Sequence, residues 1–505
     1  MSFSSAVSSI SISSGSSSTS GDTASSDAPS LLDLDLETLP DLLPYRFEDS
    51  FELLQDLDDT LEDDNWSEGS SGDDGDDEDS SDEDEDNLHW EGSRARGVGQ
   101  HVHRALRSLY AYRYQAARNT LPRGPAFLPH ILHSHKATRP DHFRQQLRIN
   151  PVTFDRLVAR LQPDPVFSND SDNSQISVEE QVAITLYRFG HYGNGASLQE
   201  VANWAGFGKG TIDLITRRVM TAILRPDFLQ ETIHYPSEEE KEKAKKWVEQ
   251  HSCKAWRDGW CMVDGTLVPL DERPFWYGES YFDRKCNYSL NVQIVSLPNL
   301  RIVDVAYGYT GSTHDATAWK QTHIAQNHET VLSEGEFVWA DSAYPIDVWI
   351  IAPYKLPERE LPDNEVYNNH VSMVRIRSEH AIGFLKGRFQ SLKGLRVRIK
   401  DARSHRFATY WVLGCIAVHG FAMQDEEDER TAAGDDSDTV AADPFIQEGL
   451  SSSSDDDLDN AGRGIRMNFG TRLQAAKARR EELKAALLRA KERQAERCVR
   501  RRMAN

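Results

Sequence analysis

WCMVDGTLVPL, at residues 260–270, begins the series of apolar runs that decides the fold of this chain. SLNVQIVSLP at 289–298 and LRIVDVAYGYTG at 300–311 follow it, and all three are rich in Val, Ile, Tyr and Thr and bounded by Pro, Asn or Gly. Such runs are typical of β-strands. A helical segment, DATAWKQTHIAQN (315–327), and a fourth strand, EFVWADSAYP (336–345), come next. Three strands, a helix and a strand predict a mixed α/β domain.

Two further helices are expected after these strands. One runs from about residue 374 to 389, and the other, RFATYWVLGCIAVHGFAM (406–423), is almost entirely apolar. A helix that is hydrophobic all round has to be buried. We therefore expect helices to flank the sheet.

The charge of the chain is divided unevenly between its ends and its centre. Residues 1–90 carry about 27 Asp and Glu against one Arg, and 425–460 about 14 acids against one Arg, whereas 461–505 is basic. The net charge of −24 therefore leaves about +5 for residues 91–424. We predict a disordered acidic tail (1–90), an acidic linker (425–460) that is also disordered, and a basic helical tail (461–505). A polyanionic ligand of the central part is not excluded.

Composition also bears on compartment. The five cysteines are scattered, with no C-x-x-C pair, which fits a reducing environment. No apolar run approaches the roughly 20 residues of a membrane span, and the N-terminus lacks the features of a signal peptide. The basic run from 477 to 502 suits nuclear import or nucleic acid contact, although such runs are often only solvated helices. We expect a nuclear protein that does not engage a membrane.

Residues 91–250 are predicted to be helical, with a helix-turn-helix outline at 197–224, SLQEVANWAGFGKGTIDLITRRVMTAIL. Its second helix would present Lys209, Arg217 and Arg218 outward, which would allow DNA binding in a major groove. The alternative is a helical hairpin that only packs against the next domain.

Four acidic residues stand in separate contexts around the predicted strands: Asp264 in WCMVDGTLVPL, Asp315 in GSTHDATAW, Asp341 in FVWADSAYP and Glu379 in VRIRSEHAIGFLKGRF. We expect Asp264 and Asp341 at strand ends, where open α/β sheets bind ligands. Hard divalent cations prefer oxygen ligands, and two of them can clamp both oxygens of a phosphodiester displacement. For a single acid the alternative is an ordinary salt bridge, and for Asp315 it is a first-turn acid of its helix.

Basic residues crowd the stretch from 375 to 400. On a helix Arg375, Glu379 and Lys386 would share one stripe, with Gly383 allowing DNA backbone or the sheet to approach it. We predict phosphate contacts by Arg375, Lys386 and Arg388, the alternative being a charged, solvated helix face.

Six ordered motifs carry a resemblance to a known family. They are D-G-T (264–266), R-K-x-x-Y-S-L-N-V-Q (284–293), G-S-x-H-D (311–315), A-D-S-x-Y-P (340–345), R-x-x-x-E (375–379) and L-K-x-R-F (385–389). Together they resemble the nuclease domain of PIF/Harbinger-type transposases, the DDE superfamily endonucleases (DDE Tnp4-like domain).

The resemblance implies an RNase H-like fold at 255–424, a mixed sheet with flanking helices, preceded by the helix-turn-helix region. It implies Asp264, Asp341 and Glu379 as catalytic metal ligands and Asp315 as a fourth ligand or a supporting residue. His314 would orient groups or contact phosphate. The cofactor would be a divalent metal, Mg²⁺ or Mn²⁺, as two ions.

The predicted function is DNA cleavage and strand transfer by a DDE carboxylate site. The partners expected are DNA and, from the resemblance, a separate Myb-like DNA-binding protein; a homo-oligomer stays open. Two alternatives remain. One is a domesticated DNA- or chromatin-binding protein without cleavage activity, and the other is a metal-dependent nuclease of repair or RNA processing.

Overall fold

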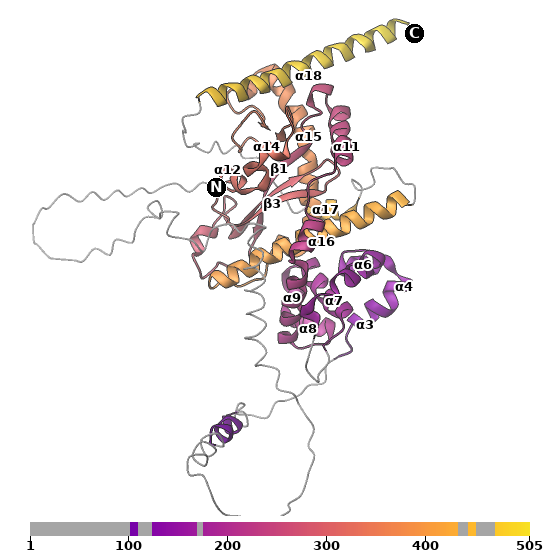
Figure 1. Cartoon of the computed structure of the whole chain (residues 1–505), viewed down its shortest axis with the longest axis vertical. Helices are drawn as coiled ribbons and strands as arrows, with labels where there is room; N and C mark the ends of the chain where they lie inside the picture. Colours follow the sequence, from indigo (N-terminus) through magenta and orange to yellow (C-terminus); the bar gives the residue numbers. More distant parts are fainter. Residues whose placement is uncertain (1–100, 110–123, 169–174, 433–442, 451–469, 505) are drawn as a thin grey trace, which may run out of the picture. The chain divides into compact units, whose positions relative to one another are not determined.

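The computed structural model describes residues 101–109, 124–168, 175–432, 443–450 and 470–504 (Figure 1). The acidic tail predicted at 1–90 lies outside the described residues.

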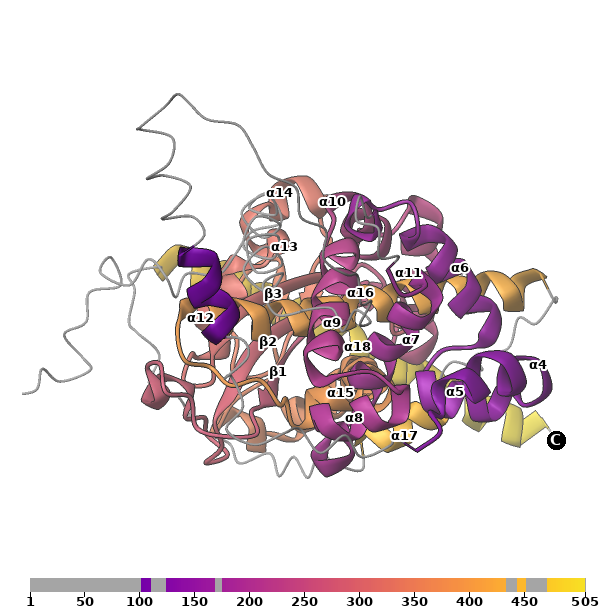
Figure 2. The ribbon, with the colours of Figure 1, turned by 90° about the horizontal axis from the view of Figure 1, so that it is seen from below.

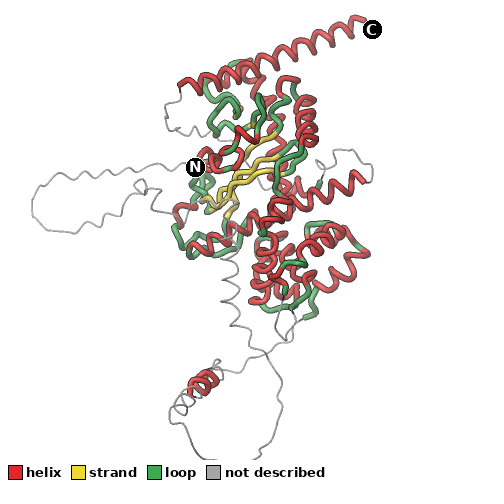
Figure 3. The backbone as a smooth tube through the Cα atoms, viewed as in Figure 1, coloured by secondary structure: helices red, strands yellow, loops and turns green. Residues whose placement is uncertain are grey.

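Five strands form one mixed sheet in the order β3-β2-β1-β4-β5 (Figure 3). The strands are β1 (Cys261–Pro269), β2 (Ser289–Ser296), β3 (Ile302–Thr310), β4 (Val338–Trp339) and β5 (Ile350–Ile351). β2 pairs antiparallel with β1 and with β3, whereas β4 pairs parallel with β1 and with β5. The predicted mixed α/β class is confirmed. β5 was not predicted, because two residues are too few to show a period.

Helices cover both faces of the sheet, which is why β2 and β3 are buried throughout. Ile294 packs in one apolar cluster with residues of helix α16 (Ala402–Ala432). The next residue, Val295, joins a different cluster with Ile324 of α13 (His323–Gln326). Since successive strand residues point to opposite faces, these two clusters lie on opposite sides of the sheet.

Helix α16 was predicted to be buried, and it is. By length and composition its segment Ala402–Thr431 could cross a membrane, but 83% of its most apolar stretch is buried inside the protein. Its residues Leu413, Ile416 and Ala417 are fully buried.

The part before the sheet is helical. Its helices are α3 (Leu128–His130), α4 (Lys136–Thr138), α5 (Pro140–Leu147), α6 (Pro151–Leu161), α7 (Val178–Gly190), α8 (Leu198–Ala205), α9 (Lys209–Ile223), α10 (Pro226–Thr232) and α11 (Glu238–His251). Figure 2 shows α7, α8 and α9 grouped together. The Ser197 hydroxyl accepts the Glu200 N–H and caps α8, and Gly206 ends α8 at φ +84°. Local sequence therefore fixes this helix pair.

Helix α9 packs against helix α16. Ile212 and Ile215 share the apolar cluster of α16, and the Arg217 guanidinium lies 4.5 Å from the centre of the Phe407 ring. This is the packing expected of the alternative, a hairpin resting on the next domain. DNA binding by α9 stays a prediction.

Helix α15 (Pro362–Arg388) crosses the short helix α17 (Pro444–Leu450) very closely. A Cβ atom on Gly387 would lie 1.7 Å from the Phe445 carbonyl oxygen, and one on Gly383 would lie 3.0 Å from Leu450. The lack of a side chain at Gly383 therefore allows helix α17 to approach closely. The prediction that DNA or the sheet would approach at Gly383 was wrong. The prediction of a disordered linker at 425–460 was wrong for two parts, because α16 continues to Ala432 and α17 buries Phe445.

The basic tail forms α18 (Gly470–Ala504), and its first half is docked on the protein. Leu483 and Leu487 are buried, and Trp256 Nε1 donates a hydrogen bond to the Leu483 carbonyl at 3.0 Å. Residues 491–502 are exposed. The expectation that the whole helix is solvated or DNA-bound therefore applies only to its second half. The remaining short helices are α12 (Asp315–Ala318) and α14 (His328–Val331).

Candidate carboxylate site

Asp264 and Asp341 are brought side by side by strand pairing. β1 and β4 pair in parallel with Met262 opposite Trp339, and each aspartate comes two residues later on its own strand path. β4 ends at Trp339, and Asp341 follows it after one residue, Ala340. Asp341 therefore lies at a strand end, as predicted. Asp264 is not at a strand end, because β1 continues to Pro269 and Asp264 is paired with Ile294.

Helix α15 completes this group from one side of the sheet. The Arg375 guanidinium lies 3.6 Å from Asp264 Oδ2 and 3.2 Å from Asp341 Oδ1. Ser378 Oγ donates to Asp264 Oδ2 at 3.3 Å. Glu379 is exposed one turn after Arg375, and its charge acts on both Asp264 and Arg375. Asp264, Asp341 and Arg375 therefore form one charged cluster, and Glu379 lies near enough to act on its electrostatics.

Asp315 joins the cluster through β2. Its Oδ1 accepts hydrogen bonds from Asn291 Nδ2 at 3.1 Å and from Gln293 Nε2 at 2.9 Å. A Cβ atom on Gly265 would lie 2.5 Å from the same oxygen, so only glycine leaves room for this carboxylate. These contacts hold Asp315 against the sheet and give it more than the role of a first-turn acid.

Asn291 and Gln293 were not among the predicted site residues. Both are buried, and they lie two residues apart, on one face of strand β2, whose other central residues are apolar. Buried amides need hydrogen-bond partners, so this alternation was a signal for a polar group above the strand. Tyr344 was missed as well: it is buried, and its hydroxyl donates to Gln293 Oε1.

Two basic or titratable residues border Asp315. Arg284, whose side chain is 60% exposed, lies 3.5 Å from Asp315 Oδ2. His314, predicted as an accessory residue, is exposed immediately before α12. Its side chain is therefore open to solvent beside the cluster.

The electrostatics of the cluster are dominated by crowded negative charge. The pKa of Asp264 is raised from its ordinary value of 3.8 to about 7, chiefly by burial; Arg375 opposes the rise, and the charges of Asp341, Glu379 and Asp315 add to it. Burial and the charges of Asp264, Asp315 and Asp341 hold the pKa of Tyr344 well above its ordinary value. For Arg375, burial lowers the pKa, but the neighbouring carboxylates outweigh it and the pKa is raised. Arg375 therefore stays charged and neutralises part of the cluster.

The oxygen donors suit a hard divalent cation, because Mg²⁺ and Mn²⁺ prefer carboxylate ligands. In the described ranges, however, no three His, Cys, Asp or Glu side chains are grouped closely enough to hold an ion together. The guanidinium of Arg375 contacts the two carboxylates that would have to converge. The residues thus fit the chemistry of a metal site in an arrangement that Arg375 keeps closed.

The residues predicted to contact DNA are placed in different surroundings. Arg388 is fully buried, paired with Glu426 at 2.8 Å, and so its guanidinium does not face a DNA backbone. Lys386 Nζ donates to the Leu267 carbonyl of β1 at 2.7 Å and anchors α15 on the sheet. Arg375 is engaged with the carboxylates, as described above. On α9, Lys209 is exposed, whereas Arg217 and Arg218 are half-buried.

Comparison with known proteins identifies the domain that carries this cluster. Residues 263–420 match the family model of the DDE superfamily endonuclease. The match includes all four acidic residues and confirms the resemblance derived from the six motifs. The chain therefore contains a domain of the DDE superfamily endonuclease family.

The chain is also similar to whole proteins of that kind. It is 25% identical over 313 residues to "Protein ALP1-like" of Arabidopsis thaliana, which covers 58% of this chain and 73% of that protein. It is 22% identical over 255 residues to "Putative nuclease HARBI1" of Rattus norvegicus, covering 49% of this chain and 68% of that protein. The Xenopus laevis protein of the same name is 23% identical over 259 residues, with 51% and 72% covered. No solved structure matches.

Proposed function

We propose that this chain is a metal-dependent DNA endonuclease and strand-transfer enzyme of the Harbinger transposase type. The observation that carries the proposal is that Asp264 of β1 and Asp341 after β4 share the Arg375 guanidinium, while Asp315 at the start of α12 and Glu379 of α15 lie near enough to act on Asp264. The strongly raised pKa of Asp264 adds to it, because such perturbed carboxylates gather at functional sites. The similarity to proteins named as nucleases supports the same reading.

Asp264, Asp341 and Glu379 would hold the divalent ions, Mg²⁺ or Mn²⁺, with Asp315 as a further ligand or an orienting group. When bound, two such ions supply Lewis-acid stabilisation of a phosphodiester and a lowered pKa for the attacking hydroxyl. The protein's own part is to position the donors. Asn291 and Gln293 fix Oδ1 of Asp315, which leaves Oδ2 directed toward Arg284.

Arg375 would have two duties in this scheme. Without a metal it compensates the negative charge of Asp264 and Asp341, and it has to release them when a cation binds. Once released, its guanidinium stays close enough to contact a phosphate of bound DNA, since planar guanidinium groups suit phosphate oxygens. Exposed Arg284 would contact the backbone beside Asp315.

Cleavage of supercoiled plasmid by the full-length chain in Mn²⁺ tests the proposal. Asp264→Asn, Asp341→Asn and Glu379→Gln should each reduce cleavage about 1,000-fold or more, because each removes a carboxylate that would hold the catalytic ions. Glu329→Gln, an exposed carboxylate on α14, is the matched control and should cleave normally. Wild-type protein that binds Mn²⁺ in calorimetry but never cuts DNA of any form would refute the proposal.

The second candidate function is a DNA- or chromatin-binding protein without cleavage activity. The observation that favours it is the pairing of Arg375 with both aspartates, which closes the cluster. Measurement of Mn²⁺ binding distinguishes the two functions. An intact cluster that takes up no Mn²⁺, even with DNA present, would leave the binding function alone.

A nuclear location and a Myb-like DNA-binding partner belong to the same proposal. The exposed second half of α18, with Arg500, Arg501 and Arg502, supports nuclear import. Substituting these three arginines with alanine in a fluorescent fusion should move the protein to the cytoplasm. Nuclear accumulation unchanged by the triple substitution would contradict the role of α18.

A further inference from the structure

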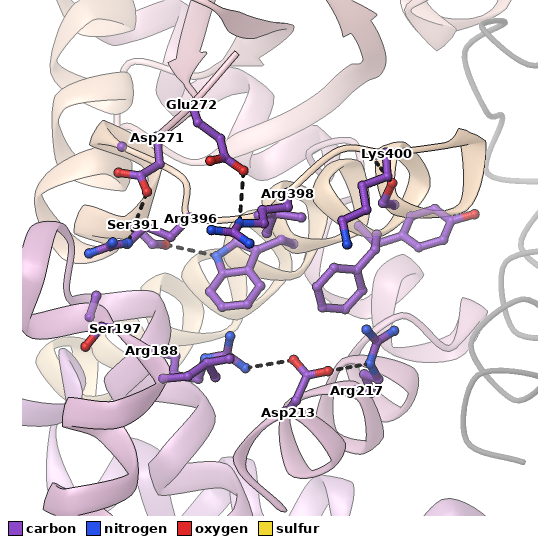
Figure 4. Close-up of a pocket in the computed structure, with 18 of the residues that line it drawn as sticks. Arg188, Ser197, Asp213, Arg217, Asp271, Glu272, Ser391, Arg396, Arg398 and Lys400 are labelled. Carbon is purple, nitrogen blue, oxygen red and sulfur yellow. Dashed lines mark hydrogen bonds and ion pairs between the residues drawn. The ribbon is translucent and has the colours of Figure 1, made fainter. Parts of the chain in front are cut away.

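A cavity of about 810 Å³ lies between helices α7 and α9 on one side and residues 394–407 on the other (Figure 4). We call it the basic cleft, because eight Lys and Arg line it against four Asp and Glu. Its residues come from the helical region, the segment after α15 and the start of α16. None of the metal-site residues named above lines it.

One wall of the basic cleft carries an uncompensated positive charge. Arg188 and Arg217 share a single carboxylate, Asp213, at 3.7 Å and 2.9 Å (Figure 4). Arg188 is only 8% exposed, and its Nη1 donates to Thr216 Oγ1 at 2.6 Å. Two buried or half-buried guanidinium groups with one carboxylate between them favour the approach of a further anion.

The electrostatics of Arg188 agree with this geometry. Its pKa is lowered to about 10, chiefly by burial; Asp213 opposes this effect, and the charge of Arg217 adds to it. A bound anion would relieve this strain on the charged form.

The start of α9 adds a second anion-attracting feature to the same wall. Lys209 and Gly210 line the cleft, and no side chain caps this end of the 15-residue helix. A Cβ atom on Gly210 would meet nothing within 4 Å, so the space above its backbone is open. Free N–H groups and the helix dipole at such an end bind phosphate oxygens.

The opposite wall is basic and partly aromatic. Arg396 pairs with Asp271 at 3.2 Å and Arg398 with Glu272 at 3.1 Å, while Lys400 is exposed at the rim. Phe407 and Trp411 also line the cavity. Both rings are buried, with the guanidinium groups of Arg217 and Arg188 over them, so the cleft would hold a nucleic acid strand by its phosphates and not by stacked bases.

The size of the cavity decides between a single strand and a duplex. A volume of 810 Å³ lies within the range of about 300–1,000 Å³ for small-ligand pockets. Because residues 394–407 stand opposite Lys209 and Arg217, a duplex that took this face of α9 into its major groove would first have to displace that segment. A short run of unpaired nucleotides fits the available space.

The cleft also lies within reach of the carboxylates. Asp271 lines the cleft and follows Asp264 by seven residues along β1 and its extension, a span of at most about 23 Å. A DNA strand that leaves the carboxylate cluster could therefore enter the basic cleft.

We propose that the basic cleft binds a single-stranded segment of DNA through its phosphates, with Lys209 and Lys400 contacting them from opposite walls. The choice of DNA rests on the proposed function, whereas the anion site does not. Unpaired DNA near a cut end would then be held away from the complementary strand.

Fluorescence anisotropy with a labelled 12-nucleotide DNA strand tests this inference. The full-length chain is measured in EDTA, and the same sequence is supplied as a duplex and as RNA. Lys209→Gln and Lys400→Gln should each weaken single-strand binding about three- to tenfold and reduce the slope of log affinity against log salt by about 0.7. Lys320→Gln, an exposed lysine on another element, should change neither quantity.

Three results would overturn the inference. They are unchanged single-strand affinity in both variants, an effect confined to the duplex, and an effect confined to RNA. Photo-crosslinking of the strand provides an independent readout: crosslinks at the start of α9 or at residues 394–404 support the cleft, and crosslinks found only on α18 count against it. Since EDTA removes cleavage from the measurement, single-strand binding by a chain that never cuts DNA would leave the cleft standing and refute only the nuclease proposal.

Discussion

Replacing Asp264 with asparagine should stabilise the metal-free protein at the same time as it removes activity. In the folded chain the pKa of Asp264 is about 7, against 3.8 for an ordinary aspartate. The folded state therefore binds this proton more tightly than the unfolded state does. The stabilisation of the folded state by protonation of Asp264 is complete below about pH 4 and is lost as the pH rises through 7.

The magnitude follows from the two pKa values. The rise from 3.8 to about 7 corresponds to about 4 kcal/mol in total, of which about 3 kcal/mol is lost between pH 5 and pH 8.5. Asparagine is neutral at every pH. The wild type should therefore lose about 3 kcal/mol of unfolding free energy between pH 5 and pH 8.5 that Asp264→Asn keeps. The difference in unfolding free energy, variant minus wild type, should be about 3 kcal/mol larger at pH 8.5 than at pH 5.

Urea unfolding at both pH values, in EDTA, measures this difference. Glu329→Gln, which removes an exposed carboxylate, should follow the wild type at both. Addition of Mn²⁺ at pH 8.5 should stabilise the wild type and not Asp264→Asn, because a ligand that binds only the folded state adds to its stability. A stability difference between Asp264→Asn and wild type that does not change with pH would refute the assigned burial and crowding of this carboxylate.

Three further changes probe the cluster and its support. Arg375→Gln should raise the affinity for Mn²⁺ on the order of tenfold in calorimetry, since a competing cation is lost; weaker binding would show that Arg375 assembles the site. Gly265→Ala should reduce plasmid cleavage 10- to 100-fold with normal circular dichroism, because its Cβ displaces the Asp315 carboxylate; full activity would exclude a role for that contact. Gly387→Ala should lower the urea midpoint by forcing α17 from α15, whereas Gly210→Ala, with open space at its Cβ, should not; equal midpoints would contradict the close crossing.

Much of the sheet domain could be predicted from local patterns. The strands that became β1, β2 and β3 are long apolar runs bounded by turn residues, and their period is visible in the sequence. The acids of the cluster could be chosen because each lies in a family motif. The position of Asp264 inside β1 could not be predicted from the sequence. The end of a strand depends on its pairing partners and not on the residues that follow it.

Other features depended on contacts between distant segments. The docking of α17 on α15 joins residues about 60 positions apart, and its acidic surroundings in the sequence predicted no structure. The burial of Arg388 depends on Glu426. The basic cleft exists only because residues 394–407 face α9.

The sequence by itself determined the class of the domain, the family to which it belongs and the acidic residues on which its chemistry would depend. These are properties of composition, period and motif, which a chain carries in any conformation. The tertiary structure alone decided that Arg375 bridges Asp264 and Asp341, that Asn291 and Gln293 hold Asp315, and that α9 turns its basic face toward a cleft. Each of these depends on side chains from distant segments meeting within about 4 Å, and local sequence does not encode such distances.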